Sequence, residues 1–300
     1  MEHLLKLADL TGAEIADILD TADKLKYQKK HGVEHHYLKG KALGMIFRKS
    51  STRTRVSFEV GMYDLGGTAL FLSSQDLQIG RGEPVQDTAR VLSRYLDGVM
   101  IRTFDQEEVE ALAEYGSIPI INGLTDYCHP CQVLADLMTI RERRGDLVGQ
   151  KMCYIGDGNN MANSLIAGGI RTGMKVAVAC PKDYTPDAEL MKWAAENGDF
   201  TCTENILEAA ANADVLFTDV WASMGQESEA EMRKKIFKGY QINDAVVAAA
   251  KPGVMVQHCL PAHREEEITA KVFEAHADEI FAEAENRLHA QKAVMVKLMA

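Results

Sequence analysis

The sequence has no run of about 18 apolar residues, which is the length that a membrane-spanning helix needs. Its first residues, 1–6, also lack the basic and then apolar pattern of a signal peptide. From these two absences we expect neither a membrane-spanning nor a secreted protein. We therefore expect a soluble, cytoplasmic protein.

The sequence also has no excess of positive charge. It contains 33 Lys and Arg but 44 Asp and Glu, which gives a net charge of −11. Non-specific binding to a nucleic-acid backbone normally requires the opposite balance. We expect no nucleic-acid partner and no membrane partner. Any anionic ligand must therefore be bound by a local cluster of donors.

The six cysteines are scattered along the chain. We expect reduced thiols and no structural disulfide, since three of the six lie inside apolar runs. The cysteines are Cys128, Cys131, Cys153, Cys180, Cys202 and Cys259.

Short apolar runs alternate with longer segments of helical periodicity, a pattern typical of βαβ units. With 300 residues and 46% hydrophobic content, the chain can form two α/β domains, each with a parallel sheet flanked by helices. The predicted strands are residues 42–47, 69–72, 99–101, 118–121, 152–155, 176–179, 215–218 and 254–257.

A charged stretch with Gly145 and Gly149 predicts the domain boundary. The first domain would comprise residues 1–144, with a helix at 284–300 packing back onto it. The second domain would comprise residues 145–283, so that helices cross between the two.

Unusual polar residues follow six of the predicted strands. Ligands of open parallel α/β sheets bind beyond the carboxyl ends of the strands, so these segments predict one cleft. The residues at these positions are Ser51, Arg102, His129, Asp157, Asp219 and His258.

The strongest local signal is the turn Ser51-Thr52-Arg53-Thr54-Arg55, which precedes a segment compatible with a helix. A helix start offers backbone N–H groups and a positive dipole end, to which this turn adds hydroxyls and a guanidinium. The turn predicts a phosphate site. A solvated helix cap remains the alternative.

The segment Cys128-His129-Pro130-Cys131-Gln132 predicts a helix that begins at Pro130, with His129 and Gln132 near its start. An imidazole there could polarise a carbonyl oxygen. The Cys-x-x-Cys spacing could also indicate a redox or zinc site, but no second Cys-x-x-Cys exists. Arg102 could be a ligand-binding residue or a surface ion-pair partner.

Three further motifs are ambiguous when each is taken alone. Residues 156–161 fail the dinucleotide fingerprint because the third glycine is absent, which leaves Asn160 as a substrate-binding or turn-forming residue. Asp219, which is followed by a loop with Ser223 and Met224, could bind a substrate amine or could cap a helix. Cys259 could be reactive, or a buried inert thiol.

Together these motifs resemble those of the transcarbamylase family. The motifs are Ser-Thr-Arg-Thr-Arg at 51–55, His-Pro-Cys-Gln at 129–132 and His-Cys-Leu-Pro at 258–261, in that order. The residues at 219–225 and 156–160 resemble the family's ornithine-specific branch.

The resemblance implies a carbamoyltransferase that transfers the carbamoyl group of carbamoyl phosphate to L-ornithine, giving L-citrulline and phosphate. It also implies a role in arginine biosynthesis and a reaction that needs no cofactor or metal. It implies an oligomer built on a trimer, in which Gln78 reaches a neighbouring subunit's site. The implied carbamoyl phosphate ligands are Ser51, Thr52, Arg53, Thr54, Arg102, His129, Pro130, Cys131, Gln132, Leu260 and Arg287. The implied ornithine ligands are Asn160, Asp219, Ser223, Met224 and Cys259.

In the mechanism that follows, Asp219 and Cys259 orient and help deprotonate the ornithine side-chain amine, which attacks the carbonyl carbon directly. Arg102, His129, Thr54 and the Cys259–Leu260 backbone would stabilise the oxyanion. Two alternatives stay open: another acceptor such as putrescine, aspartate or an acylated ornithine, and a catalytically silent subunit with the same fold.

Overall fold

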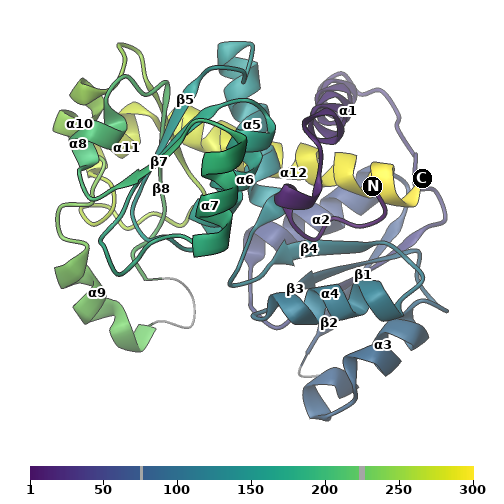
Figure 1. Ribbon diagram of the computed structural model, residues 1–300. Coiled ribbons are helices and arrows are strands. Elements are labelled where there is room, and N and C mark those ends of the chain that lie inside the picture. Colours follow the sequence, from purple (N-terminus) through teal and green to yellow (C-terminus); the bar gives the residue numbers. More distant parts are fainter. Residues whose placement is uncertain (75–76, 223–226) are drawn as a thin grey trace. The chain divides into compact units, whose positions relative to one another are not determined.

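The computed structural model describes residues 1–74, 77–222 and 227–300, which divide into two compact units (Figure 1). Residues 1–134 and 287–300 form unit 1, and residues 135–286 form unit 2. Two helices, α5 (Pro130–Arg144) and α12 (Ala277–Met299), contain residues of both units. The units divide inside α5, whereas the sequence predicted the boundary at the end of that helix.

Unit 1 is built on a four-stranded parallel sheet in the order β2-β1-β3-β4. Its strands are β1 (Ala42–Phe47), β2 (Thr68–Ser73), β3 (Gly98–Arg102) and β4 (Ile120–Leu124). Its helices are α1 (Gly12–Lys30), α2 (Thr52–Asp64), α3 (Val85–Leu92), α4 (Gln106–Tyr115), and the short η1 (Leu7–Asp9) and η2 (Gln78–Arg81).

Helices cover both faces of the unit 1 sheet (Figure 1). Helices α3 and α4 bury Ala89, Val109 and Leu112 in a cluster with Ile46 and Ile101 of the sheet. Helix α2 packs closely on α12, since a Cβ atom at Gly61 would lie 2.8 Å from Met295 Cε. This close packing brings the C-terminal helix beside the turn that follows β1.

Unit 2 is built on a five-stranded parallel sheet in the order β7-β6-β5-β8-β9. Its strands are β5 (Lys151–Ile155), β6 (Lys175–Ala179), β7 (Phe200–Thr203), β8 (Val215–Thr218) and β9 (Met255–His258). Its helices are α6 (Asn160–Arg171), α7 (Ala188–Asn197), α8 (Ile206–Ala210), α9 (Ala230–Ile236), α10 (Asp244–Ala249), α11 (Ala270–Ala275) and the short η3 (Glu227–Glu229).

The predicted α/β class and the parallel sheets are confirmed. The bounds predicted for β1 and β8 match the structure, whereas β4 begins two residues later than expected. The sequence missed β7 because its residues, Phe200 to Thr203, are half-buried or exposed at the edge of the sheet and form no apolar run.

None of the helices in the described ranges is both long enough and apolar enough to cross a membrane.

Candidate active site

The polar segments that follow the predicted strands form two sets, one in each unit. In unit 1 they follow β1, β3 and β4, and in unit 2 they follow β5, β8 and β9. Because parallel strands end at the same edge of a sheet, each set lies at the carboxyl edge of its own sheet.

The predicted phosphate turn is the start of α2. Ser51 is its N-cap, and its hydroxyl accepts the Thr54 N–H at 3.2 Å. Thr54 is buried, whereas Thr52 and Arg53 are exposed at the first turn. Ser51 thus caps the helix, as the helix-cap interpretation predicts. The positive helix end and the exposed Arg53 side chain are also compatible with a phosphate site.

Arg287 of α12 connects this turn to the start of α5. Its guanidinium donates to Gln132 Oε1 at 2.6 Å and to Thr54 Oγ1 at 3.2 Å, and its Nε donates to Gln291 at 2.9 Å. Arg287 and Gln132 are both buried. Three segments far apart in sequence therefore place hydrogen-bonding groups around one point of unit 1.

His129 lies in a cationic environment at the start of α5. Burial and then the charges of Arg287, Arg102 and Arg53 lower the pKa of His129 well below its usual 6.5. The imidazole is therefore neutral at physiological pH. A neutral imidazole among three guanidinium groups can donate to a carbonyl oxygen while the guanidinium groups bind an anion.

The lowered pKa of His129 predicts a pH dependence of stability. The unfolded chain takes up the proton first as the pH falls through 6.5, so stability is lost below that pH. We expect this residue to contribute a slope of about 1.4 kcal/mol per pH unit there. Urea unfolding of the wild type and of His129→Gln between about pH 7.5 and 5.5 measures it. Parallel pH profiles for the two proteins would contradict the prediction.

Cys128 and Cys131 are buried thiols of the unit 1 core. Burial raises the pKa of both to about 12, and Cys131 Sγ contacts the Asn122 carbonyl at 3.4 Å. A reactive thiol pair needs a lowered pKa and access to solvent. The redox reading of this Cys-x-x-Cys is therefore disfavoured, and Pro130 and Cys131 shape the start of α5.

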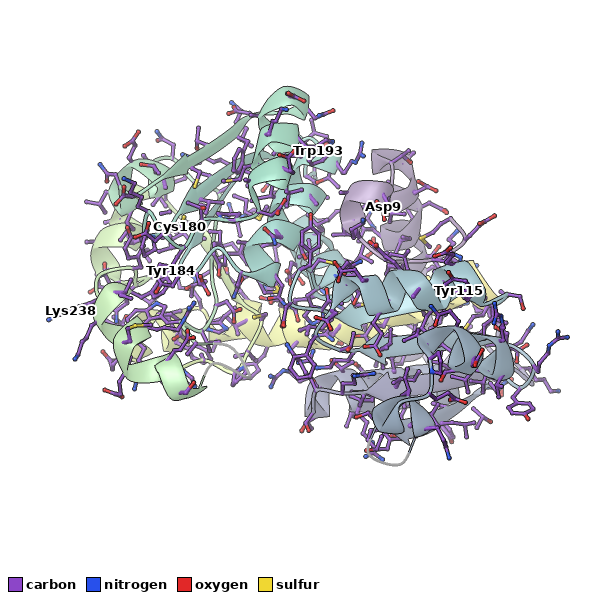
Figure 2. The ribbon with its side chains drawn as sticks, turned by 60° about the horizontal axis from the view of Figure 1, so that its bottom comes forward. Asp9, Tyr115, Cys180, Tyr184, Trp193 and Lys238 are labelled. Atoms are coloured by element: carbon purple, nitrogen blue, oxygen red, sulfur yellow. The ribbon has the colours of Figure 1, made fainter. Side chains whose placement is uncertain are left out.

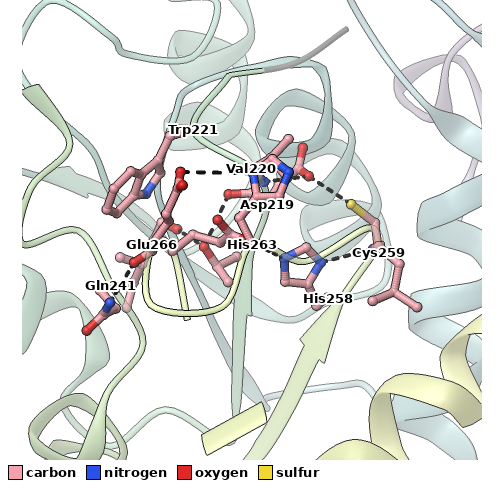
Figure 3. Close-up of polar contacts among 12 residues, drawn as sticks. Asp219, Val220, Trp221, Gln241, His258, Cys259, His263 and Glu266 are labelled. Carbon is pink, nitrogen blue, oxygen red and sulfur yellow. Dashed lines mark hydrogen bonds and ion pairs between the residues drawn. The ribbon is translucent and has the colours of Figure 1, made fainter. Parts of the chain in front are cut away.

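In unit 2 the carboxylate of Asp219 is held by three donors (Figure 3). The Val220 N–H donates to Oδ1 at 2.8 Å, the Cys259 thiol donates to Oδ1 at 3.1 Å, and the Asn159 amide donates to Oδ2 at 2.9 Å. Asp219 is largely buried. These bonds orient the carboxylate at the end of β8, a different role from that of a helix cap.

Acidic groups surround the Cys259 thiol. Burial and then the charges of Asp219, Glu283 and Asp136 raise its pKa well above the usual value. The thiol therefore remains protonated and serves as a hydrogen-bond donor to Asp219. A thiol in this state is a poor nucleophile and a poor base.

The conformation of the Cys259–Leu260 segment is set by His258. The Leu260 N–H donates to His258 Nδ1 at 2.9 Å, which leaves the ring proton on Nε2 for Glu267 at 2.9 Å. Leu260 has a φ of 58°, a region that non-glycine residues rarely adopt. The Leu260 N–H is thus bonded to His258, and the oxyanion role expected of the Cys259–Leu260 backbone stays a prediction.

Asp157 has a structural partner. It pairs with the buried Arg233, which also donates to the Trp221 carbonyl at 2.5 Å. Burial raises the Asp157 pKa to about 6, although the Arg233 charge opposes the rise. Arg233 therefore links the loop that follows β5 to the segment that follows Asp219.

Asn159 has a double role that the sequence did not reveal. Its Oδ1 caps α6 by accepting the Met161 and Ala162 N–H groups at 2.9 and 3.2 Å, while its Nδ2 donates to Asp219. We had expected the next residue, Asn160, to carry the site's amide. Asn160 is the first residue of α6 and is half-buried.

We expect Asn159→Ala to lower the free energy of unfolding by about 2 kcal/mol, since a cap and a donor to a buried carboxylate are lost together. It should also lower kcat about tenfold, because Asp219 loses its orientation. The control is Asn243→Ala, which removes a cap of the same pattern on α10. Equal effects of both variants on kcat would contradict this role.

One group of side chains has the composition of a cation site. Ligand atoms of His263, Glu266 and Glu267 lie within 4.8 Å of one another. Two of these residues already have partners, however. Glu266 pairs with the Lys234 ammonium at 3.0 Å, and Glu267 accepts hydrogen bonds from His258 and from the His263 N–H. We assign no metal to this group.

Two of the expected site residues, Ser223 and Met224, lie outside the described residues. Gln78 begins η2 and is exposed. Conversely, Asp136, Asn159, Arg233 and Glu283 were missed as site residues, because each acts through neighbours that are distant in the sequence.

Known proteins resemble this chain over nearly its whole length. The family model "Aspartate/ornithine carbamoyltransferase, carbamoyl-P binding domain" matches residues 2–142, and the companion "Asp/Orn binding domain" matches residues 148–298. Ornithine carbamoyltransferase of Oceanobacillus iheyensis is 57% identical over 301 residues, covering 99% of this chain and 94% of that protein. The Thermococcus kodakarensis enzyme is 53% identical, with coverages of 99% and 96%.

Solved structures of ornithine carbamoyltransferases have a fold closely similar to that of this chain. Ornithine carbamoyltransferase from Pyrococcus furiosus superposes with a TM-score of 0.95 at 53% identity, covering 99% of this chain and 97% of that one. Anabolic ornithine carbamoyltransferase from Campylobacter jejuni superposes with a TM-score of 0.93 at 40% identity, covering 99% of both chains.

Proposed function

This chain belongs to the aspartate/ornithine carbamoyltransferase family and transfers carbamoyl groups to ornithine, and we propose that it does so by direct attack of the ornithine side-chain amine. Citrulline and phosphate are the products. The single observation that carries the assignment of substrates to units is electrostatic. Cationic groups surround His129 in unit 1, and acidic groups surround Cys259 in unit 2.

Unit 1 provides the groups for carbamoyl phosphate. The start of α2, with Ser51, Thr52, Arg53 and Thr54, binds the phosphate, and Arg102 bridges the phosphate and the carbamoyl oxygen. His129 is neutral and donates to the same oxygen, while Gln132, ordered by Arg287, binds the carbamoyl amide. Charge-assisted bonds to the departing phosphate strengthen as it takes up negative charge.

Unit 2 provides the groups for ornithine. The amine must lose a proton before it attacks, and the oriented Asp219 carboxylate accepts that proton. The protonated Cys259 thiol holds Asp219 and does not form a covalent intermediate. Asn160, Ser223 and Met224 contact the rest of ornithine.

A comparison of amine acceptors tests the function. Purified protein with carbamoyl phosphate should form citrulline from ornithine with a far higher kcat/KM than it shows for putrescine, aspartate or acetylornithine. Faster carbamoylation of putrescine would overturn the acceptor. Absence of phosphate release with every acceptor would support the silent-subunit alternative.

We also propose a trimer in which Gln78 completes a neighbouring subunit's site. In support, β2 is an edge strand with Leu70 and Phe71 exposed, and Val56 of α2 is also exposed. An exposed apolar edge strand is a surface that proteins normally cover. Unit 1 therefore has a surface suited to a second copy of the chain.

Phe71→Glu should shift the protein from trimer to monomer, because a charge would be buried at that edge. Light scattering coupled to gel filtration measures the change. Tyr95→Glu alters another exposed aromatic residue of unit 1 and should leave the mass unchanged. A wild-type protein that elutes as a monomer would contradict the proposal.

We also propose that the protein is cytoplasmic. In support, its six cysteines form no disulfide in the structure, as is typical of proteins in a reducing compartment.

A further inference from the structure

Two cysteines outside the active site face each other on neighbouring strands of unit 2. Cys180 directly follows β6 and Cys202 lies in β7, with their Sγ atoms 3.7 Å apart. In the strand register Cys202 is opposite Val178, so Cys180 is its diagonal neighbour on the same face. Neither thiol takes part in the transfer reaction proposed above.

The two thiols differ in exposure. Cys180 is buried and Cys202 is exposed. The contact between the two sulfur atoms lowers the pKa of Cys202, and the same contact together with burial raises the pKa of Cys180. An accessible thiol of lowered pKa beside a buried thiol is the arrangement of an attacking and a resolving cysteine.

We propose that Cys180 and Cys202 form a redox-sensitive disulfide when the protein meets a low-molecular-weight disulfide such as oxidised glutathione. The Cys202 thiolate attacks one glutathione sulfur, forming a mixed disulfide and expelling a glutathione thiolate. The Cys180 sulfur then gives up its proton, attacks Cys202 Sγ and expels the second glutathione thiolate. Two protein thiols are oxidised by two electrons, and one glutathione disulfide becomes two glutathione thiols.

The disulfide requires only a local contraction. The sulfur atoms must approach by about 1.7 Å to reach disulfide bonding distance. Cys180 leads into a tight loop that contains Tyr184 (Figure 2). In this loop the Tyr184 N–H donates to the Pro181 carbonyl at 2.9 Å. The contraction would therefore pull on the loop between Cys180 and α7.

This loop contacts the segment that holds Asp219. The Gly158 N–H donates to the Tyr184 carbonyl at 2.8 Å, and a Cβ atom at Gly158 would lie 2.2 Å from Pro186 N. Because Gly158 is packed closely against this loop, a shift of the loop would also move the adjacent Asn159, which donates a hydrogen bond to Asp219. Given the ornithine role proposed for Asp219, oxidation should change the KM for ornithine several-fold and leave the KM for carbamoyl phosphate unchanged.

The experiment treats the folded protein with oxidised glutathione, blocks the remaining thiols and maps the peptides by mass spectrometry. We expect a Cys180–Cys202 disulfide, with the peptide of buried Cys153 blocked as a free thiol, as an internal control. Dithiothreitol should restore the reduced protein. Stable glutathionylation of Cys202 without a bond to Cys180, or no oxidation of either residue, would overturn the proposal whatever the protein's activity is.

Kinetics of Cys202→Ser provide the second measurement. This variant should keep the reduced protein's kinetics and become insensitive to oxidised glutathione. An oxidant response that persists in Cys202→Ser would assign the effect to another thiol. A mapped disulfide with an unchanged KM for ornithine would disprove the transmission through Gly158, while leaving the disulfide itself established.

Discussion

Asp219→Asn is expected to lower kcat/KM for ornithine about 10³-fold, within the range that a proton acceptor usually contributes. Asparagine keeps the shape of the side chain but cannot take the proton of the attacking amine. Binding of carbamoyl phosphate should be almost unchanged, because no unit 1 group changes. Steady-state kinetics and calorimetric titration with carbamoyl phosphate measure the two effects.

The same variant has a second readout at Cys259. Asp219 is among the causes that raise the pKa of this thiol, so its removal should lower that pKa toward the ordinary value. Alkylation of Cys259 should then begin at lower pH than in the wild type. Asp199→Asn, which changes an exposed carboxylate of the same unit, is the control. A loss in kcat/KM of less than about tenfold would show that Asp219 is not the proton acceptor.

Arg53→Ala is expected to weaken carbamoyl phosphate binding about 100-fold, the effect of losing one or two charge-assisted hydrogen bonds to phosphate. Arg53 is exposed at the first turn of α2, so its removal leaves no cavity and the variant should fold normally. The KM for ornithine at saturating carbamoyl phosphate should change little. Titration calorimetry with carbamoyl phosphate and steady-state kinetics with ornithine measure the two constants.

Arg90→Ala is the control for a general loss of positive charge. Arg90 is an exposed residue of unit 1 that pairs with Asp87 on α3. If Arg53→Ala and Arg90→Ala weakened carbamoyl phosphate binding equally, long-range charge rather than a local phosphate site would account for the affinity. Equal loss of ornithine and carbamoyl phosphate affinity in Arg53→Ala would contradict the division of substrates between units.

Much of the fold was accessible from local sequence, because apolar runs, helix caps and turn residues act over a few positions. The bounds of β1 and β8, and the helix start at Pro130, were predicted in this way. Strand β7 was not, since an edge strand with half of its residues exposed needs no apolar pattern. The two compact units divide inside α5, whereas the boundary predicted at 144/145 lies between the stretches that the two family models match, 2–142 and 148–298.

In the candidate site, too, some features follow from local sequence and others from tertiary structure. Local sequence determined the Ser51-to-Arg55 turn, the His129 helix start and the Asp219 and Cys259 strand ends, because each motif is continuous. Tertiary structure alone decided their chemistry. Arg287 orders Gln132, Asn159 holds Asp219, and guanidinium or carboxylate groups distant in sequence keep His129 neutral and Cys259 protonated. These effects act through space, so only the folded chain sets them.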